Sequence, residues 1–151
     1  VCSSDLHKFS FKSRVRMRSS KLYVVDNGFA TAINEMKDDD EGWKLENVVY
    51  LELLRRSYDN PYNVYYHKST YEIDFVIVRG RKVCELVQVC TSLSNEQTRR
   101  REIQALVRGA EDLHCENLKL ITFDSSREVR LAAHTVRQIN VAEWLNNWDN
   151  G

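Results

Sequence analysis

The fold of this chain is decided by residues 63–90, which read NVYYHKSTYEIDFVIVRGRKVCELVQVC. Three segments of this stretch are rich in valine, isoleucine and tyrosine, a composition that favours β-strands: residues 63–68, 72–78 and 82–90. Arg79-Gly80-Arg81 forms a tight hairpin connection between the last two segments. Because the segments are too short and too close together for crossover connections, the stretch predicts an antiparallel meander.

Helical patterns lie on both sides of this meander. Residues 43–57 contain good helix formers and no helix breaker, and their apolar side chains lie almost all round the predicted helix. We therefore expect a central helix that is covered on most sides. Residues 94–97, Ser-Asn-Glu-Gln, are a capping box that opens a second helix, and its apolar stripe includes Ile103, Leu106 and Ala110.

Further strands are predicted near both ends of the chain. Residues 21–25, KLYVV, have the composition of a buried strand. Residues 117–123, NLKLITF, follow a strand and a helix, so we expect them to join the sheet through a crossover. A short strand around residues 135–141 leads into a helical turn at residues 143–145. The pattern is that of an α/β domain with a mixed central sheet and helices on both faces.

Composition places the chain among ordinary globular domains. It has 151 residues, 22 basic and 22 acidic side chains, five glycines and one proline. This length is typical of one domain, and no apolar run approaches the roughly 20 residues that span a bilayer. The four cysteines are scattered and no secretory segment precedes them, which favours reduced thiols and a cytoplasmic location.

The start of the sequence does not look like the start of a domain. There is no initiator methionine, and the first six residues, VCSSDL, resemble translated adapter sequence. We therefore expect residues 1–20 to be the tail of an upstream linker or domain, and residues 21–151 to form the domain itself.

Several kinds of site are excluded by missing motifs. The five glycines are too dispersed for a phosphate-binding loop, so we expect no ATP site on this chain. Cys84 and Cys90 share a strand face but lie about 20 Å apart along it, too far to hold one metal ion. No serine or cysteine has the surroundings of an acyl-transfer nucleophile.

Two basic segments are candidates for nucleic-acid contact, although the net charge is zero. The first, around residues 8–21, alternates apolar and basic residues as a half-buried strand does, and its candidate phosphate contacts are Lys12, Arg14, Arg16 and Arg18. The second is Arg99-Arg100-Arg101 at the start of the predicted second helix. For the first segment the alternative is a connecting strand whose polar face is solvated. For the second it is a solvated helix face, with the arginines paired to Glu96 and Glu102 at helical spacing.

Two carboxylates stand at positions that need an explanation. Asp74 interrupts the apolar strand EIDFVIV, and Glu46 lies in the first turns of the covered helix. A carboxylate in such surroundings needs a partner, a metal ion or an exposed face. For Asp74 the simplest partner is a salt bridge to Arg79, Lys68 or Lys82.

Most of the chain, about residues 9–148, resembles one known kind of domain. The resemblance rests on KLYVVDNGFATAI, GWKLENVVYLELLRR, VYYHKSTYEIDFVI, KVCELVQVCTSLSNEQTRRREIQAL and NLKLITFD, in this order and spacing. These segments are similar to the C-terminal domain, of unknown function, of predicted archaeal and bacterial AAA+-type ATPases. That domain resembles members of the PD-(D/E)XK nuclease superfamily, which implies a restriction-endonuclease-like fold.

The resemblance implies a degenerate metal site. In the superfamily a helix glutamate, a strand aspartate and an acid-x-lysine on the next strand hold Mg²⁺, which stabilises the charge of phosphodiester cleavage. Glu46 and Asp74 match the first two positions, whereas Gln88 replaces the acid and Cys90 replaces the lysine. The carbonyl of Gln88 could still face a metal ion, but the thiol of Cys90 supplies no cation.

Two nearby residues are possible replacements for the missing groups. Lys68, on the neighbouring strand, could substitute for the lost lysine. Glu85 is an odd number of residues from Gln88, so we expect it to point to the opposite face.

By resemblance, then, the chain is a nuclease-like module whose ATPase domain lies upstream on the same native chain. We expect it to be catalytically degenerate and to bind nucleic acid, such as DNA, or a partner protein. The alternative is an active Mg²⁺-dependent DNA endonuclease. The sequence does not indicate an oligomeric state.

Overall fold

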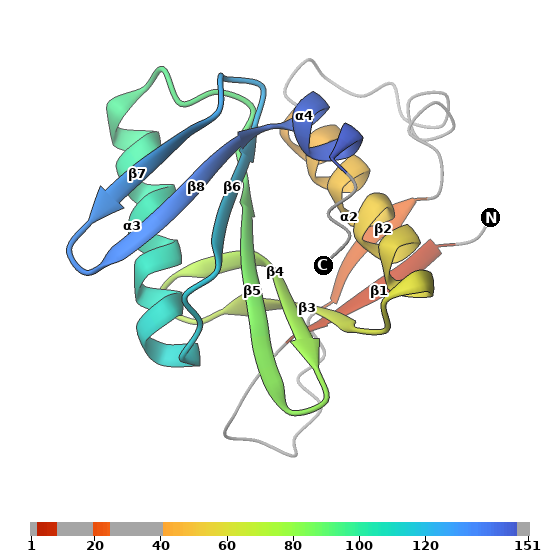
Figure 1. The fold of residues 1–151 in the computed structure, drawn as a ribbon. Helices are drawn as coiled ribbons and strands as arrows, with labels where there is room; N and C mark the ends of the chain where they lie inside the picture. Colours follow the sequence, from red (N-terminus) through yellow and green to blue (C-terminus); the bar gives the residue numbers. More distant parts are fainter. Residues whose placement is uncertain (1–2, 9–19, 25–40, 148–151) are drawn as a thin grey trace.

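The computed structural model describes residues 3–8, 20–24 and 41–147 (Figure 1). Strands of the described residues form one mixed eight-stranded sheet in the order β2-β1-β3-β4-β5-β6-β8-β7. The strands are β1 (Ser3–Lys8), β2 (Ser20–Val24), β3 (Asn63–Lys68), β4 (Glu72–Arg79), β5 (Lys82–Val89), β6 (Leu118–Thr122), β7 (Arg127–Leu131) and β8 (His134–Asn140). The helices are α2 (Glu41–Asp59), α3 (Glu96–Leu113) and α4 (Val141–Asn146).

The predicted meander is confirmed at the centre of the sheet. Strands β3, β4 and β5 are successive antiparallel neighbours, with Phe75 opposite Val87. Arg79 pairs with Lys82, so Gly80 and Arg81 form a two-residue turn. Gly80 has a φ of +60°, a left-handed conformation that glycine adopts without steric cost.

Helix α3 makes the predicted crossover from β5 to β6, which run parallel to each other. The helix lies close to the sheet at Gly109, where an added Cβ would lie 3.1 Å from a methyl carbon of Leu86. The N-cap differs from the capping-box prediction. Asn95 is the capping residue, because its side chain accepts hydrogen bonds from the backbone N–H groups of Gln97 and Thr98 at 2.9 and 3.1 Å.

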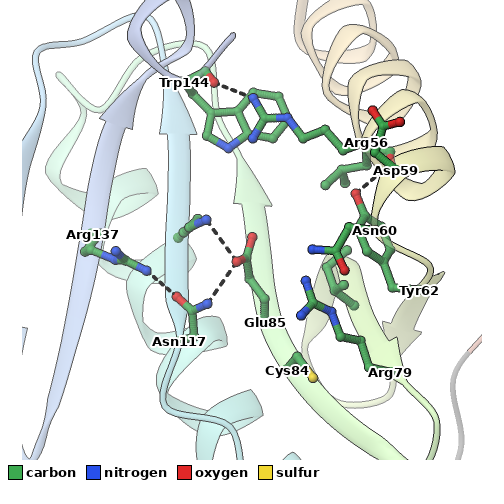
Figure 2. A pocket seen from close by; sticks show the side chains of 13 residues that line it. Arg56, Asp59, Asn60, Tyr62, Arg79, Cys84, Glu85, Asn117, Arg137 and Trp144 are labelled. Carbon is green, nitrogen blue, oxygen red and sulfur yellow. Dashed lines mark hydrogen bonds and ion pairs between the residues drawn. The ribbon is translucent and has the colours of Figure 1, made fainter. Parts of the chain in front are cut away.

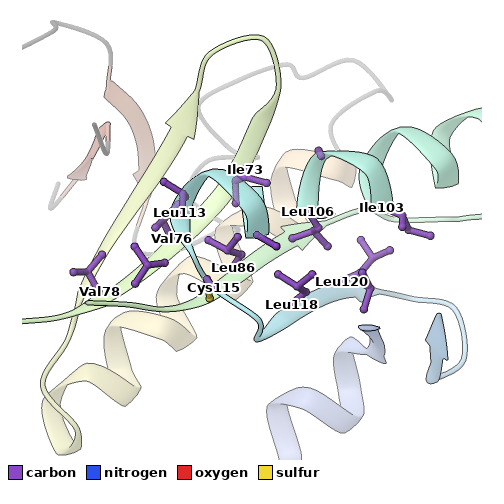
Figure 3. Packing of buried hydrophobic residues seen from close by; sticks show 14 of the residues in the cluster. Ile73, Val76, Val78, Leu86, Ile103, Leu106, Leu113, Cys115, Leu118 and Leu120 are labelled. Atoms are coloured by element: carbon purple, nitrogen blue, oxygen red, sulfur yellow. The ribbon is translucent and has the colours of Figure 1, made fainter. Parts of the chain in front are cut away.

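Helices pack against both faces of the sheet, as predicted. Under α3, a core that includes Ile73, Leu86 and Leu106 fills one face (Figure 3). Helices α2 and α4 cover the other face, where Phe75 and Trp144 belong to a second core. The successive apolar residues of β4 thus serve both cores, which explains why this strand is a nearly continuous apolar run.

Two features at the edges of the sheet were not expected. Strand β7 lies at one edge, paired antiparallel with β8, and its exposed residues give no apolar alternation. Strand β1 pairs antiparallel with β2 and parallel with β3, so residues 3–8 of the segment predicted as an upstream tail are part of the sheet. The predicted basic strand with Lys12, Arg14, Arg16 and Arg18 lies outside the described residues.

Among the helices that the structure describes, none combines the length and the apolar composition that crossing a bilayer requires.

Candidate functional site

Three of the residues predicted to form a site line one depression between α2 and α3. They are Glu46 from α2, Asp74 from β4 and Gln88 from β5. The depression has a volume of about 560 Å³, and Arg101 and Arg108 of α3 line its other side. Adjacent strands and the starts of two helices thus bring together side chains that are far apart in the sequence.

A lysine that the sequence analysis did not select lies among the carboxylates. Lys21 Nζ lies 2.9 Å from one carboxylate oxygen of each of three residues, namely Glu46, Glu72 and Asp74. An ammonium group has three N–H bonds and no lone pair to accept with. Each N–H of Lys21 therefore has a carboxylate acceptor, and Asp74 has Lys21 as its partner instead of Arg79, Lys68 or Lys82.

The carboxylates keep Lys21 charged. Burial disfavours the ammonium form, but the charges of Asp74 and Glu46 and hydrogen bonds to Glu72 and Asp74 outweigh burial and raise the pKa of Lys21. The pKa of Glu72 shifts in the opposite direction: partial burial favours a higher value, but the contacts with Lys21 and Lys68 outweigh burial and lower it. Lys21 is therefore a cation and Glu72 an anion at neutral pH.

Glu46 is fixed by a tyrosine as well as by Lys21. Tyr23, which is 1% exposed, donates a hydrogen bond from its hydroxyl to Glu46 Oε1 at 2.5 Å. Its ring stacks on Tyr50 of α2, with ring centroids 4.2 Å apart. Burial and the charge of Glu46 raise the pKa of Tyr23, so the phenol remains a donor. Strand β2 thus contributes both Lys21 and Tyr23.

Asp74 and Gln88 are joined by hydrogen bonds across β4 and β5. Asp74 Oδ2 accepts from the backbone N–H of Val89 at 3.0 Å, and Gln88 Oε1 accepts from the backbone N–H of Asp74 at 3.2 Å. Gln88 Nε2 donates to Glu102 Oε2 at 2.7 Å. Burial and the negative charge of Glu46 raise the pKa of Asp74, against the opposing effect of Lys21. Gln88 therefore connects both strands to α3.

These residues do not fit the Mg²⁺ ion that the resemblance implies. Lys21 Nζ already lies among Glu46, Glu72 and Asp74, and the carbonyl oxygen of Gln88 accepts from a backbone amide. Within the part of the chain that the structure describes, no group of three or more histidine, cysteine, aspartate or glutamate side chains could hold a metal ion. The cluster holds an internal ammonium where a metal site would need free oxygen ligands.

The other candidates for the missing groups do not complete the site. Among the described residues Lys68 pairs with Glu72 alone, at 3.2 Å, and its side chain is 60% exposed. The thiol of Cys90 donates to the carbonyl of Ser92, and burial raises the pKa of Cys90, so the thiol stays neutral. Glu85 lies elsewhere, with its carboxylate 2.9 Å from Lys119 Nζ.

Comparison with known proteins places the chain in a family. A model of a domain of unknown function, DUF4143, matches residues 41–143. The chain belongs to the DUF4143 family. An uncharacterized protein of Methanocaldococcus jannaschii is 40% identical over 122 residues, which are 79% of this chain and 26% of that protein. The chain thus spans about a quarter of that relative's length. No solved structure matches the chain.

Three consecutive arginines, Arg99, Arg100 and Arg101, lie at the start of α3 beside the site. Arg99 and Arg100 both pair with Glu96, at 2.7 and 2.9 Å, and Arg101 lies 2.6 Å from Glu102. The predicted pairing is therefore present, although Arg101 pairs with its immediate neighbour instead of at helical spacing. The side chains of Arg100 and Arg101 remain 73% exposed.

Lys21 is the main site residue that sequence reasoning missed. It lies before the residues that the family model matches, where it begins the segment KLYVV. Its position between a basic run and a buried strand was the available signal. A lysine at a strand start is ordinarily solvated, so only the fold reveals its three acceptors.

Proposed function

We propose that this chain is a nuclease-like module without nuclease activity that binds nucleic acid. In this proposal it is the C-terminal part of an AAA+-type ATPase whose nucleotide-binding domain lies upstream on the native chain. The order of a helix glutamate, a strand aspartate and a glutamine on the next strand supports the PD-(D/E)XK assignment. The much greater length of the archaeal relative is compatible with a module in a longer protein.

The position of Lys21 is the observation that best supports the proposed loss of catalysis. Metal-dependent phosphodiester cleavage needs oxygen ligands that are free to bind Mg²⁺ and a group that orients the attacking water. Here the carboxylates of Glu46, Glu72 and Asp74 each accept from Lys21 at 2.9 Å. Lys21 in turn has no N–H left for a water molecule or a phosphate. The cluster is therefore suited to hold the strands and α2 together.

Exposed arginines beside the depression favour nucleic acid as the ligand. Arg101 lines the depression beside Asp74 and also a second one at the start of α3, which it shares with Arg100. Arg108 also lines the depression beside Asp74. Arginine guanidinium groups at such a rim can pair with successive phosphates.

DNA binding by the whole chain tests this proposal. We expect fluorescence anisotropy to show salt-dependent binding of labelled duplex or single-stranded DNA, with the same affinity in EDTA and in Mg²⁺. The triple variant Arg99→Glu, Arg100→Glu, Arg101→Glu should bind at least about tenfold more weakly, because it places acidic groups opposite the phosphates.

A charge-matched control variant separates the effect of the α3 arginines on DNA affinity from the effect of net charge. Arg55, Arg81 and Arg130 are exposed and lie away from the start of α3, so their triple reversal to glutamate changes the net charge equally. We expect it to weaken binding much less. Equal weakening by both triple variants, or no DNA binding at all, would contradict the nucleic-acid proposal and leave a protein partner.

The second candidate is a Mg²⁺-dependent DNA endonuclease. It is favoured by the meeting of Glu46, Glu72 and Asp74 in one depression. We expect no nicking of supercoiled plasmid by the chain in Mg²⁺ or Mn²⁺, because Lys21 engages each of these carboxylates. Nicking that Asp74→Ala abolishes would establish the endonuclease and overturn the proposed loss of catalysis.

A further inference from the structure

A second pocket lies on the face of the sheet that α2 and α4 cover (Figure 2). Its volume is about 400 Å³, within the range of roughly 300–1,000 Å³ typical of small-molecule sites. It shares no lining residue with the depression that holds Lys21's partners. Its charged lining residues are Arg56, Asp59, Arg79, Glu85, Lys119 and Arg137. The lining therefore has more cationic than acidic side chains.

One wall of this pocket is held by a chain of hydrogen bonds. Arg137 donates to the side-chain oxygen of Asn117, and Asn117 Nδ2 donates to Glu85 Oε2 at 2.9 Å. Lys119 Nζ lies 2.9 Å from the same oxygen of Glu85. Glu85 is thus balanced by Lys119, while Arg137 is oriented by a neutral amide.

Arg79 faces this wall from the other side of the pocket (Figure 2). Neither Arg79 nor Arg137 forms an ion pair with another described residue, whereas Arg56 pairs with Glu52 at 2.7 Å. Two guanidinium groups on opposite walls therefore face a shared space without a carboxylate partner. Such an arrangement attracts an anion with several oxygen acceptors.

A buried donor adds an independent indication of a ligand. Trp144 of α4 is 3% exposed, lines the pocket, and has a side-chain nitrogen without a hydrogen-bond partner among the described residues. Arg56 fixes the ring by stacking over it at 4.3 Å and by donating to the Trp144 carbonyl at 2.6 Å. A buried N–H that is left unsatisfied is unfavourable, so such groups are usually satisfied in proteins by water or a ligand.

We propose that this pocket binds a small organic oxyanion, a molecule that carries a phosphate or a carboxylate group. The guanidinium groups of Arg79 and Arg137 would pair with its oxygens, and the Trp144 N–H would donate to one of them. The inference does not depend on the proposed DNA-binding role, because it uses another face of the sheet and other residues.

Nuclear magnetic resonance of the whole chain gives a test that reports directly from the pocket. The indole N–H signal of Trp144 is assigned with the Trp144→Phe variant, and AMP and citrate serve as probes at constant ionic strength. We expect one of them to move this signal in a saturable way, and the difference between them decides between phosphate and carboxylate. Sodium chloride alone should leave the signal unmoved.

Matched variants identify the residues that bind the probe. The double variant Arg79→Gln, Arg137→Gln should bind at least about tenfold more weakly, because it removes the charge-assisted hydrogen bonds to the anion. Arg81→Gln removes a neighbouring exposed arginine that does not line the pocket, and should bind as the wild type does. Unfolding curves of the variants check that each retains its fold.

Three results would overturn the proposal. The first is no movement of the Trp144 signal by either probe up to about 10 mM, which corresponds to binding weaker than about 3 kcal/mol. The second is equal loss of affinity in Arg81→Gln and in the double variant. The third is a signal that moves with DNA and with neither small probe, which would make the pocket part of a nucleic-acid surface.

Discussion

Single residues determine the chemistry that this site can perform. In the proposed match to the PD-(D/E)XK pattern, which depends on four positions, Gln88 and Cys90 stand where the pattern has an acid and a lysine. The structure adds that Lys21 comes from another strand and places its ammonium among the remaining carboxylates. A lysine in this position compensates their charge permanently, whereas a metal ion would have to be bound and could be lost. With Lys21 among its carboxylates, the cluster is a structural element.

Removing the charge of Lys21 should reveal what the carboxylates can do by themselves. In Lys21→Met we expect the free energy of unfolding to fall by about 3 kcal/mol, since breaking a buried ion pair leaves uncompensated charge. We also expect Mn²⁺ to stabilise this variant in thermal unfolding, because an ion can then enter between Glu46 and Asp74.

Lys68→Met is the control for the Lys21 variant. Lys68 contacts Glu72 from an exposed position, so its removal should cost less than about 1 kcal/mol and create no response to Mn²⁺. Stabilisation of the wild-type chain by Mn²⁺ to the same extent as Lys21→Met would show that Lys21 does not fill the position of a metal ion.

At the scale of elements, the local sequence pattern was sufficient wherever apolar periodicity was strong. The helix expected over residues 43–57 is observed as α2, and the meander is observed as β3, β4 and β5. Strand β7 gave no such signal, because it lies at an edge of the sheet and most of its side chains face solvent. Apolar sequence patterns arise from burial, so an exposed edge strand carries no such pattern and is not predicted.

The start of α3 allows a test of which residue caps the helix. The sequence pattern favours Ser94, whereas in the structure Asn95 accepts from two backbone N–H groups. Asn95→Ala should therefore lower the free energy of unfolding by about 1 kcal/mol in denaturant titrations. Ser94→Ala serves as the comparison and should change the free energy of unfolding by less than about 0.5 kcal/mol. A larger loss of stability in Ser94→Ala than in Asn95→Ala would show that Ser94 caps the helix, as the sequence pattern predicts.

At the scale of the whole molecule, the buried phenols and Lys21 predict how stability depends on pH. Burial raises the pKa of Tyr62 to about 12, and the pKa values of Tyr23 and Lys21 are also raised. Above pH 10 the folded chain then holds protons that the unfolded chain has released, so stability falls as pH rises. We expect full stability from these groups below about pH 10 and progressive loss above it.

Denaturant titrations between about pH 8 and pH 11 measure this dependence. In Tyr23→Phe the free energy of unfolding should fall less steeply as the pH rises, because one buried phenol no longer resists ionisation. Tyr58 is 87% exposed, so Tyr58→Phe should leave the slope of the wild type unchanged. A slope that is equally steep in Tyr23→Phe would contradict the assignment of the effect to Tyr23.

The sequence by itself determined most of the elements and the placing of helices on both faces of the sheet, because alternating and helical apolar patterns are local consequences of burial. It also singled out Glu46 and Asp74, since a carboxylate within an apolar element needs a partner, whereas Gln88 was found only through the family resemblance. Only the tertiary structure decided what these residues contact. Lys21 is 25 positions from Glu46 and 53 from Asp74, and no local pattern specifies which distant side chain will fill the space between two carboxylates.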